Sequence, residues 1–297
     1  MFQYARIFSF ILLLGLLAFG PSLHSKSIVK QSSIPPSISE DYSITSIVRL
    51  GSHDLPRVSI IIDDAGENLD LLEHLVELPF SVTVSVIPGT LHDAESAGWA
   101  KRHGFEVMVH LPMEPEAYPE KDPGKNAILT SMSNRKLKEM TLDLIEEIPY
   151  ASGVNNHMGS RFTQSAAKMN PVMDMIARKQ LYFVDSRTTP FSNAFQIAQF
   201  KKIPSAERNL FLDDDSQQIL DRFQELVQLA KIQGSAIGIA HLRTATLAVL
   251  KSIDISEYRD VQFVFASDLC SINQQYASRF KPKHSPNISG SSQLRAR

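Results

Sequence analysis

The stretch 58–66 constrains the fold most, because in it an apolar run ends in two adjacent carboxylates. It reads V-S-I-I-I-D-D-A-G. The run is too continuous for a sheet with one solvated face and predicts a strand buried on both faces, as in parallel sheets covered by helices. Ligands bind at the carboxyl ends of such strands, where Asp63 and Asp64 stand.

Side chains alternate along a strand, so Asp63 and Asp64 are expected to point in different directions. One of them would be a metal ligand, and the other a base or a group that orients a ligand. The structural alternative is an aspartate that caps the helix after the strand.

The composition excludes several classes of protein. The chain has 297 residues and a net charge of -2, which suits one sizeable domain with appendages and gives no support to nucleic-acid binding. A single cysteine, Cys270, excludes a disulfide or a cysteine-based metal site within the chain. The sequence contains neither G-x-x-x-x-G-K-[ST] nor G-x-G-x-x-G, the glycine motifs that bind phosphate groups, so no nucleotide binding is predicted. It also lacks the G-x-S-x-G motif, so no covalent nucleophile is predicted.

The two ends of the chain differ from its middle. Residues 1–25 carry Arg6, an apolar segment at 7–20 and Ser25, which predict a signal peptide whose apolar core is short for a membrane span. A retained N-terminal anchor is the alternative; either way we expect a periplasmic or secreted protein, with no stable membrane span after cleavage. Residues 26–55 are predicted to be a flexible linker, 56–270 the folded domain, and 271–297 a polar, disordered tail.

Within the domain, buried strands alternate with amphipathic helices, which predicts an α/β fold with a parallel sheet or barrel. After the first strand, strands are predicted at 80–87, 105–110, 153–156, 181–185, 210–212, 236–240 and 261–265. Helices are predicted at 69–77, 93–103, 134–148, 166–179, 217–233 and 244–252.

Polar or ionisable residues follow six of these strands at the same end. They are Asp63 and Asp64; His110 and Glu114; Asn155, Asn156, His157 and Arg161; Asp185 and Arg187; Asp213; and His241. A core histidine or a capping aspartate explains any single case, but six cases in register favour a functional site.

These residue types suit one divalent metal. A carboxylate and two imidazoles without cysteine favour a borderline ion such as Zn²⁺, with an open position for water. Such an ion lowers the pKa of water and polarises a carbonyl oxygen, while a second carboxylate serves as base and a further histidine protonates the leaving group. The other histidines fall in helices or outside the domain and are not expected to bind metal: His24, His53, His74, His92, His103 and His284.

Six motifs in one order carry a family resemblance: I-I-I-D-D-A-G, E-V-M-V-H-L-P-M-E-P, G-V-N-N-H-M-G-S-R-F-T, F-V-D-S-R-T-T, F-L-D and G-I-A-H. Over about 56–270 the chain resembles the divergent polysaccharide deacetylase family, secreted bacterial proteins related to NodB-type carbohydrate esterases. The resemblance implies an irregular (β/α) barrel of about seven parallel strands. It also implies metal-dependent hydrolysis of N-acetyl groups on a polysaccharide or peptidoglycan-type glycan.

The resemblance also implies roles for individual residues. Asp63 would be the base, Asp64 and His110 metal ligands, and His241 the acid. NodB-type enzymes take two histidines from one H-[ST]-x-x-H motif, whereas here L-P-M-E follows His110, so that His157 or Glu114 would complete the site. The family usually shows proline after its last histidine, and Leu242 stands there in this chain.

By analogy, a further set would bind substrate or orient the catalytic groups: Glu114, Asn156, Arg161, Asp185, Arg187 and Asp213. The altered histidine motif keeps open a second function, that of a catalytically inactive glycan-binding or envelope-assembly protein on the same fold. A metal phosphoesterase is the third, although it would usually need more carboxylates and a second metal.

Overall fold

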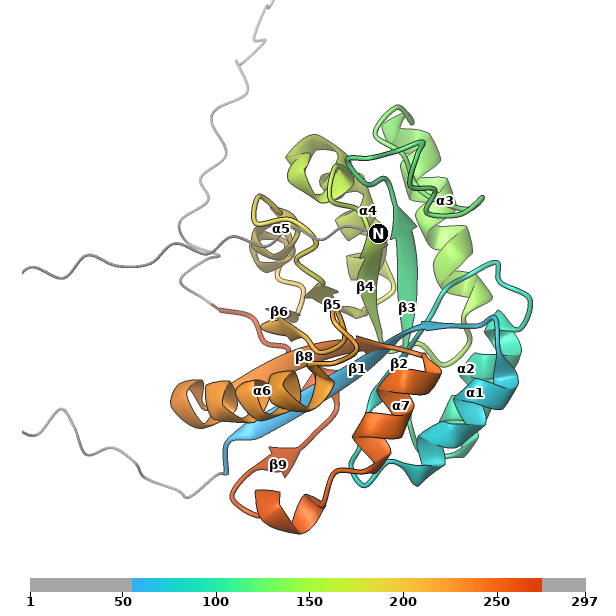
Figure 1. The fold of residues 1–297 in the computed structure, drawn as a ribbon. Helices are drawn as coiled ribbons and strands as arrows, with labels where there is room; N and C mark the ends of the chain where they lie inside the picture. The colour runs from blue at the N-terminus through green and yellow to red at the C-terminus, as the bar shows by residue number, and fades with distance from the viewer. Residues whose placement is uncertain (1–54, 274–297) are drawn as a thin grey trace, which may run out of the picture. The chain divides into compact units, whose positions relative to one another are not determined.

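In the computed structural model, which describes residues 55–273, the strands form one nine-stranded sheet (Figure 1). Every strand ladder in it is parallel. The order is β6-β5-β4-β3-β2-β1-β8-β7, with β9 also beside β1. The strands are β1 (Arg57–Ala65), β2 (Thr83–Val86), β3 (Glu106–Met113), β4 (Gly153–Met158), β5 (Tyr182–Asp185), β6 (Ser205–Glu207), β7 (Leu210–Phe211), β8 (Ser235–His241) and β9 (Gln262–Phe263).

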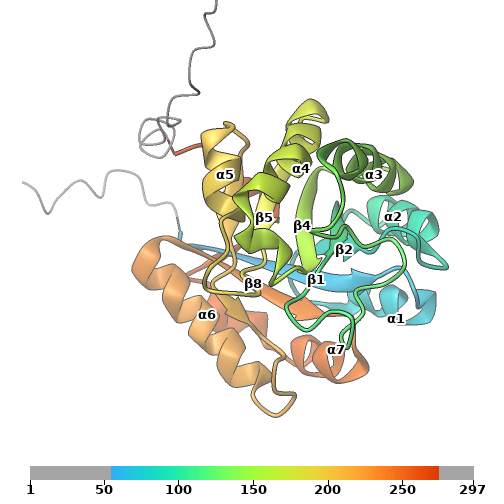
Figure 2. The ribbon, with the colours of Figure 1, turned by 90° about the horizontal axis from the view of Figure 1, so that it is seen from above.

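The sheet curls into an incomplete barrel with helices outside it (Figures 1 and 2). No ladder within residues 55–273 joins β6 to β7, so the barrel is open there. The helices are α1 (Leu69–Glu73), α2 (Asp93–Arg102), α3 (Asn134–Glu147), α4 (Ala166–Arg178), α5 (Ala194–Phe200), α6 (Ile219–Gln233) and α7 (Thr244–Lys251). Four short 3-10 helices join them: η2 (His74–Glu77), η3 (Phe162–Gln164), η4 (Ile255–Tyr258) and η5 (Ala266–Leu269).

The irregular (β/α) barrel of parallel strands predicted from the sequence is therefore confirmed. Each predicted strand and helix is present, and β6 and α5 are additional. The sheet has nine strands rather than about seven because the short β6 and β9 also pair with it.

Burial on both faces of β1 explains its continuous apolar sequence. Ile60 and Ile62 belong to the core between sheet and helices, whereas Ile61 joins a smaller cluster inside the barrel with Met108 and Ile239. All five side chains are fully buried. Alternation along β1 thus directs Asp63, two residues after Ile61, toward the barrel interior.

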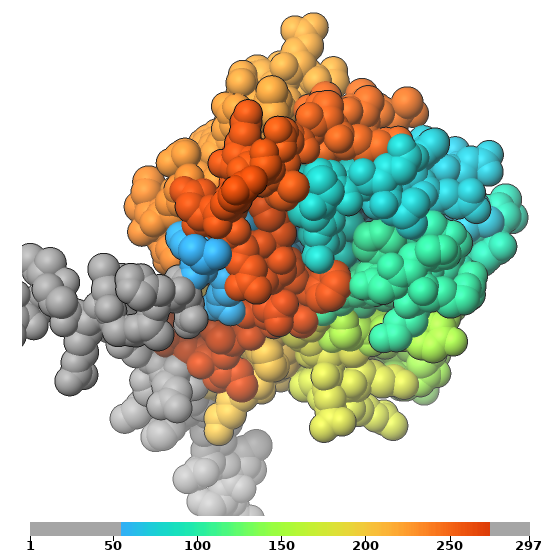
Figure 3. All heavy atoms as spheres, turned by 90° about the horizontal axis from the view of Figure 1, so that it is seen from below, coloured from blue at the N-terminus to red at the C-terminus, as the bar shows by residue number. Residues whose placement is uncertain are grey.

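The two ends of the barrel differ. Seen from below, the chain around η5 lies across the middle of the lower face (Figure 3). There the backbone N–H groups of Ala266 and Ser267 donate hydrogen bonds to Thr83 Oγ1 and Glu106 Oε1, the side chains of the first residues of β2 and β3. The carboxyl ends of the strands, at the opposite mouth, remain available for a site.

The predicted signal peptide (1–25), almost all of the linker (26–55) and most of the tail (271–297) lie outside the described residues. Of the tail, Ser271 forms an antiparallel bridge with Ser205 of β6. Among residues 55–273 no helix has the length and apolar character needed to cross a membrane.

Candidate metal and active site

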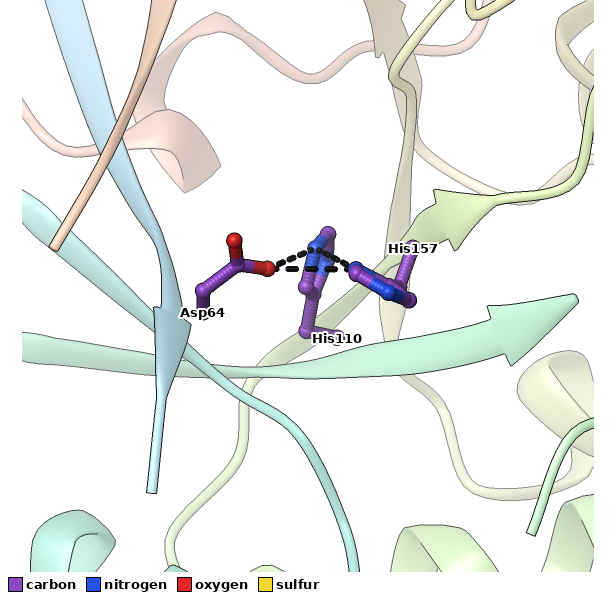
Figure 4. Close-up of side chains that lie close together, drawn as sticks. All are labelled: Asp64, His110 and His157. Atoms are coloured by element: carbon purple, nitrogen blue, oxygen red, sulfur yellow. Dashed lines mark hydrogen bonds and ion pairs between the residues drawn. The ribbon is translucent and has the colours of Figure 1, made fainter. Parts of the chain in front are cut away.

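Three side chains from three strand ends meet at the upper mouth of the barrel: Asp64 of β1, His110 of β3 and His157 of β4 (Figure 4). Asp64 Oδ1 lies 3.3 Å from His110 Nε2 and 3.1 Å from His157 Nδ1, and the two nitrogens lie 3.1 Å apart. These are the three residues that the family resemblance implies as metal ligands, with His157 rather than Glu114 completing the set.

Asp63 and Asp64 do not point in opposite directions, contrary to the sequence prediction. Their carboxylates lie 3.5 and 3.3 Å from the same atom, His110 Nε2. The alternation fails because Asp64 has a φ of 63°, and the register of β1 against β2 shifts between Ile62 and Ala65. Aspartate adopts this left-handed conformation more readily than most residues, and the resulting bulge re-aims its side chain.

A buried asparagine orients His110. Asn155 Oδ1 accepts hydrogen bonds from His110 Nδ1 at 2.7 Å and from Ser85 Oγ at 2.7 Å, and Asn155 Nδ2 donates to Asp63 Oδ1 at 2.8 Å. With the Nδ1 proton directed at Asn155, the Nε2 lone pair of His110 faces the cluster, as in metal sites whose outer partners select the tautomer. One side chain thus positions both a ligand and the candidate base.

His241, at the end of β8, forms a pair with Asp213. Its Nδ1 donates to Asp213 Oδ1 at 2.8 Å, and its backbone N–H donates to Asp213 Oδ2, which also accepts from Thr246 Oγ1 at 2.7 Å. The imidazole stacks on Phe211 with ring centroids 5.8 Å apart. His241 therefore has a fixed orientation, with Nε2 left free of Asp213.

The charges of the site shift its protonation equilibria. Burial raises the pKa of Asp63, and the neighbouring His110 and His241 only partly offset this. Burial also opposes ionisation of Asp64, but the two adjacent imidazoles hold its pKa far below its usual range. Burial disfavours the protonated form of His241, yet the hydrogen bond and charge of Asp213 raise its pKa overall.

The cluster fits a divalent cation. Asp64 Oδ1 is buried and receives no well-directed hydrogen bond, although two imidazoles lie close to it. One carboxylate and two imidazoles are a donor set typical of catalytic zinc, which keeps an open position beside three protein ligands. A cation between these atoms would give the Asp64 oxygen the partner that it lacks.

A cavity of about 400 Å³ opens over the cluster and over His241. Asp63 and Asn156 also line it, and Asn156 joins β4 to the chain after β5 by accepting a hydrogen bond from the backbone of Ser186. The cavity is large enough for part of a small organic substrate, in the range of ligand pockets.

Of the six residues expected to bind substrate or orient the catalytic groups, only Asn156 lines this cavity; the other five do not: Glu114, Arg161, Asp185, Arg187 and Asp213. Glu114 accepts hydrogen bonds from Thr130 and from Arg161, and so ties together the chain segments that follow β3 and β4. Asp185 accepts from Ser192 and from the backbone of Arg187, and Arg187 pairs with Glu207. These contacts shape the loops around the site.

Several residues of the site had no role assigned from the sequence: Asn155, Lys121, Phe211, Asp214 and Arg243. Asn155 stands two residues before His157 in G-V-N-N-H, which places it at a strand end but does not show that it contacts His110. Lys121 comes from the long connection between β3 and α3, where no periodic pattern indicates which side chain turns inward.

The fold and the site together define an irregular (β/α) barrel with an Asp-His-His cluster at its strand ends. A family model described as divergent polysaccharide deacetylase matches residues 60–270. The chain belongs to this family.

Its relatives include proteins without an assigned function. The chain is 34% identical over 215 residues to the uncharacterized protein YibQ of Escherichia coli K12, covering 72% of this chain and 67% of YibQ. It is 30% identical to an uncharacterized protein of Haemophilus influenzae Rd, covering 72% and 76% of the two chains. The crystal structure of the uncharacterized protein ATU2773 from Agrobacterium tumefaciens C58 is similar with a TM-score of 0.69 at 25% identity, covering 74% and 90%.

Proposed function

We propose that this protein is a metal-dependent deacetylase that hydrolyses N-acetyl groups on a glycan outside the cytoplasm. The observation that carries the proposal is the convergence on one cavity of the Asp64–His110–His157 cluster, the Asp63 carboxylate and the Asp213–His241 pair. Family membership supports the substrate class. The location rests on the N-terminal sequence, and cell fractionation of the full-length protein tests it.

Asp64, His110 and His157 would hold the metal, for which Zn²⁺ is the preferred ion. When bound, such an ion supplies a Lewis acid that polarises the acetamide carbonyl and lowers the pKa of a nearby water. Asn155 contributes by keeping the Nε2 atom of His110 directed at the cluster.

Asp63 and His241 would move the protons. Asp63 accepts a proton from the water that attacks the acetamide carbon, and burial strengthens it as a base by raising its pKa. His241 donates a proton to the amine as the C–N bond breaks, which yields acetate and a free amino sugar. Asp213 keeps His241 protonated and oriented for this step.

Metal content tests the first part of the proposal. We expect about one zinc per chain by elemental analysis, and its loss in His157→Ala, because two remaining ligands hold the ion poorly. The exposed His74, which pairs with Glu77 on the surface, provides the matched control His74→Ala with unchanged zinc. Absence of zinc from the wild type, even after incubation with the ion, contradicts the metal site.

Acetate release tests the second part. We expect the wild type to release acetate from N-acetylated glycan oligomers, and Asp63→Asn and His241→Gln to lose this activity while they keep their fold. If both variants still support the cellular role of the protein, the role is that of a non-catalytic glycan-binding or envelope-assembly protein. Release of phosphate from an aryl phosphate, without acetate release, would instead support a phosphoesterase.

A further inference from the structure

Arg208 stands in the two-residue connection between β6 and β7, at the opening of the barrel. We infer that it is a positioning residue: through the ring of Phe211 it holds His241 in the orientation from which this histidine donates a proton to the amine. The catalytic part of this inference rests on the proposed function. The contacts themselves involve neither the metal cluster nor a bound substrate.

Three successive carbonyl groups of the chain that leaves β5 converge on Arg208. Its backbone N–H donates to Asp185 O at 3.0 Å, its Nε to Ser186 O at 2.6 Å and its Nη2 to Arg187 O at 2.8 Å. The next residue of the connection, Asn209, donates its N–H to the backbone of β8 at 2.8 Å. The connection is therefore bonded to both sides of the opening, and the guanidinium has a fixed position.

The guanidinium of Arg208 lies over the ring of Phe211, with its Cζ 3.6 Å from the ring centroid. This distance is within the range of a favourable cation–π contact. Burial lowers the pKa of Arg208 to about 10, so the guanidinium keeps its charge at neutral pH. Since β7 has only two residues, both half-buried, core packing constrains Phe211 less than a residue inside the sheet. The contact with Arg208 supplies the missing constraint.

The ring of Phe211 also stacks on the imidazole of His241, with centroids 5.8 Å apart and an angle of 21° between the planes. The hydrogen bond to Asp213 holds only the Nδ1 atom of His241, and a ring held at one atom can still rock about that bond. A general acid must bring its proton donor to within about 2.6–3.2 Å of the atom that it protonates. Stacking on Phe211 limits the rocking and so directs the Nε2 atom of His241 to one place in the cavity.

Two measurements on the full-length protein test this inference together. The first is the NMR signals of the His241 ring in the metal-free protein, identified by their loss in His241→Gln, and the second is the kinetics of acetate release by the zinc-loaded protein. Arg208→Met keeps an apolar side chain but loses the charge and both side-chain hydrogen bonds. We expect it to move the His241 signals in the direction in which Phe211→Leu moves them. We also expect kcat to fall about tenfold or more and KM to change less than about threefold, because the substrate still binds but the acid is misplaced.

Further variants separate positioning from general damage. Arg208→Lys should resemble Arg208→Met, since an ammonium lacks the planar fork that bonds two carbonyls and stacks on a ring. Phe211→Tyr keeps an aromatic ring, so it should restore the His241 signals and the kcat that Phe211→Leu loses. In the Phe211→Leu background, Arg208→Met should not move the His241 signals further, because the ring through which the arginine acts is already absent. Arg222→Met is the control: Arg222 pairs with Glu225 on the surface of α6, and its loss should change neither measurement.

Unchanged His241 signals in both Arg208 variants overturn the inference whatever happens to kcat, because a loss of kcat alone would come from the chain after β5. Moved signals with an unchanged kcat overturn it as well, since the orientation of His241 would then not limit proton transfer. The proposed function fails separately. If the wild type releases no acetate, the deacetylase is refuted, while the signals still show whether Arg208 orients His241. If the wild type releases acetate and the Arg208 variants change neither measurement, the inference is refuted and the deacetylase stands.

Discussion

Removal of the Asn155 side chain is the sharpest test of how the site is organised. Asn155 is fully buried and makes three hydrogen bonds, to Asp63, His110 and Ser85, all between 2.7 and 2.8 Å. In Asn155→Ala these buried polar groups lose a partner at once. Each such group costs about 1–3 kcal/mol, so for the three groups we expect a loss of at least about 3 kcal/mol in the free energy of unfolding.

The same change should weaken zinc binding. Without Asn155 Oδ1 the imidazole of His110 is free to rotate and to change tautomer, and loss of such an outer partner typically lowers metal affinity by about 10- to 100-fold. Competition with a chelator measures the affinity, and urea unfolding of the metal-free protein measures the stability. Asn155→Ala that binds zinc as tightly as the wild type would refute the orienting role, whatever its stability.

Two further variants separate the roles of Asn155. Ser85→Ala removes one donor to Asn155 Oδ1 and leaves the His110 bond intact, so we expect a cost of about 1 kcal/mol with unchanged zinc affinity. Asn155→Asp keeps an acceptor for His110 but places a second carboxylate beside Asp63. Like charges at this distance raise the pKa of Asp63 so far that its carboxyl group stays protonated at neutral pH and no longer accepts a proton, so this variant should keep zinc and lose acetate release.

Three other perturbations have defined outcomes. Acetate release should fall as the pH rises through the pKa of His241, because the acid then loses its proton. Asp213→Asn removes the charge that raises this pKa, so the falling limb of the pH–rate profile should move to lower pH. Burial opposes ionisation of Glu114, but the hydrogen bonds to its carboxylate lower its pKa overall. The ionised Glu114 therefore stabilises the folded protein fully above the ordinary pKa of 4.5. This stabilisation is lost as the pH falls through the lower pKa of the folded state. By urea unfolding, Glu114→Gln should therefore cost about 1–2 kcal/mol at neutral pH and much less in acid. Gly153→Ala should cost about 1–3 kcal/mol, because the new Cβ would lie 2.3 Å from the ring of Tyr182.

Matched controls make these outcomes specific. Glu120 is exposed and forms no ion pair among residues 55–273, so Glu120→Gln should leave the acid dependence of unfolding unchanged. Gly98 lies inside α2, where a Cβ would meet only the flexible end of Arg102 at 3.3 Å. Gly98→Ala should therefore stabilise the protein by about 0.5–1 kcal/mol through helix propensity. If Gly98→Ala destabilised the protein as much as Gly153→Ala, the cost of the latter could not be assigned to the clash with Tyr182.

The sequence predicts most of the barrel because its central strands are long apolar runs. The additional strand β6 is three residues, S-A-E, whose last two are only half-buried, so no hydrophobic pattern marks it. It forms because β5 and Ser271 offer it backbone partners, which is tertiary information. The seven-residue α5 is likewise too short for a helical period to stand out against its surroundings.

The direction of Asp64 was not predictable from alternation. Asp64 lies two and four residues after Ile62 and Ile60, which face the helices, so in a regular strand it would point to the same side and be buried among them. Its φ of 63° and the register shift before Ala65 turn it to the opposite side. Such a bulge depends on how β1 and β2 pair, and the sequence D-D-A-G is compatible with it but does not specify it.

The third ligand shows most clearly what strand register adds. A single-motif site would take its second histidine four residues after His110, but Glu114 stands there and is held by Thr130 and Arg161. In the parallel pairing of β3 with β4, His110 lies opposite Asn155, so His157, two residues further along β4, faces the same side. Asn155 and His157 thus reach one imidazole from neighbouring positions, one at Nδ1 and the other at Nε2. A shift of one residue in this ladder would turn both away from His110, so the ligand set depends on the pairing of two strands as much as on its three residues.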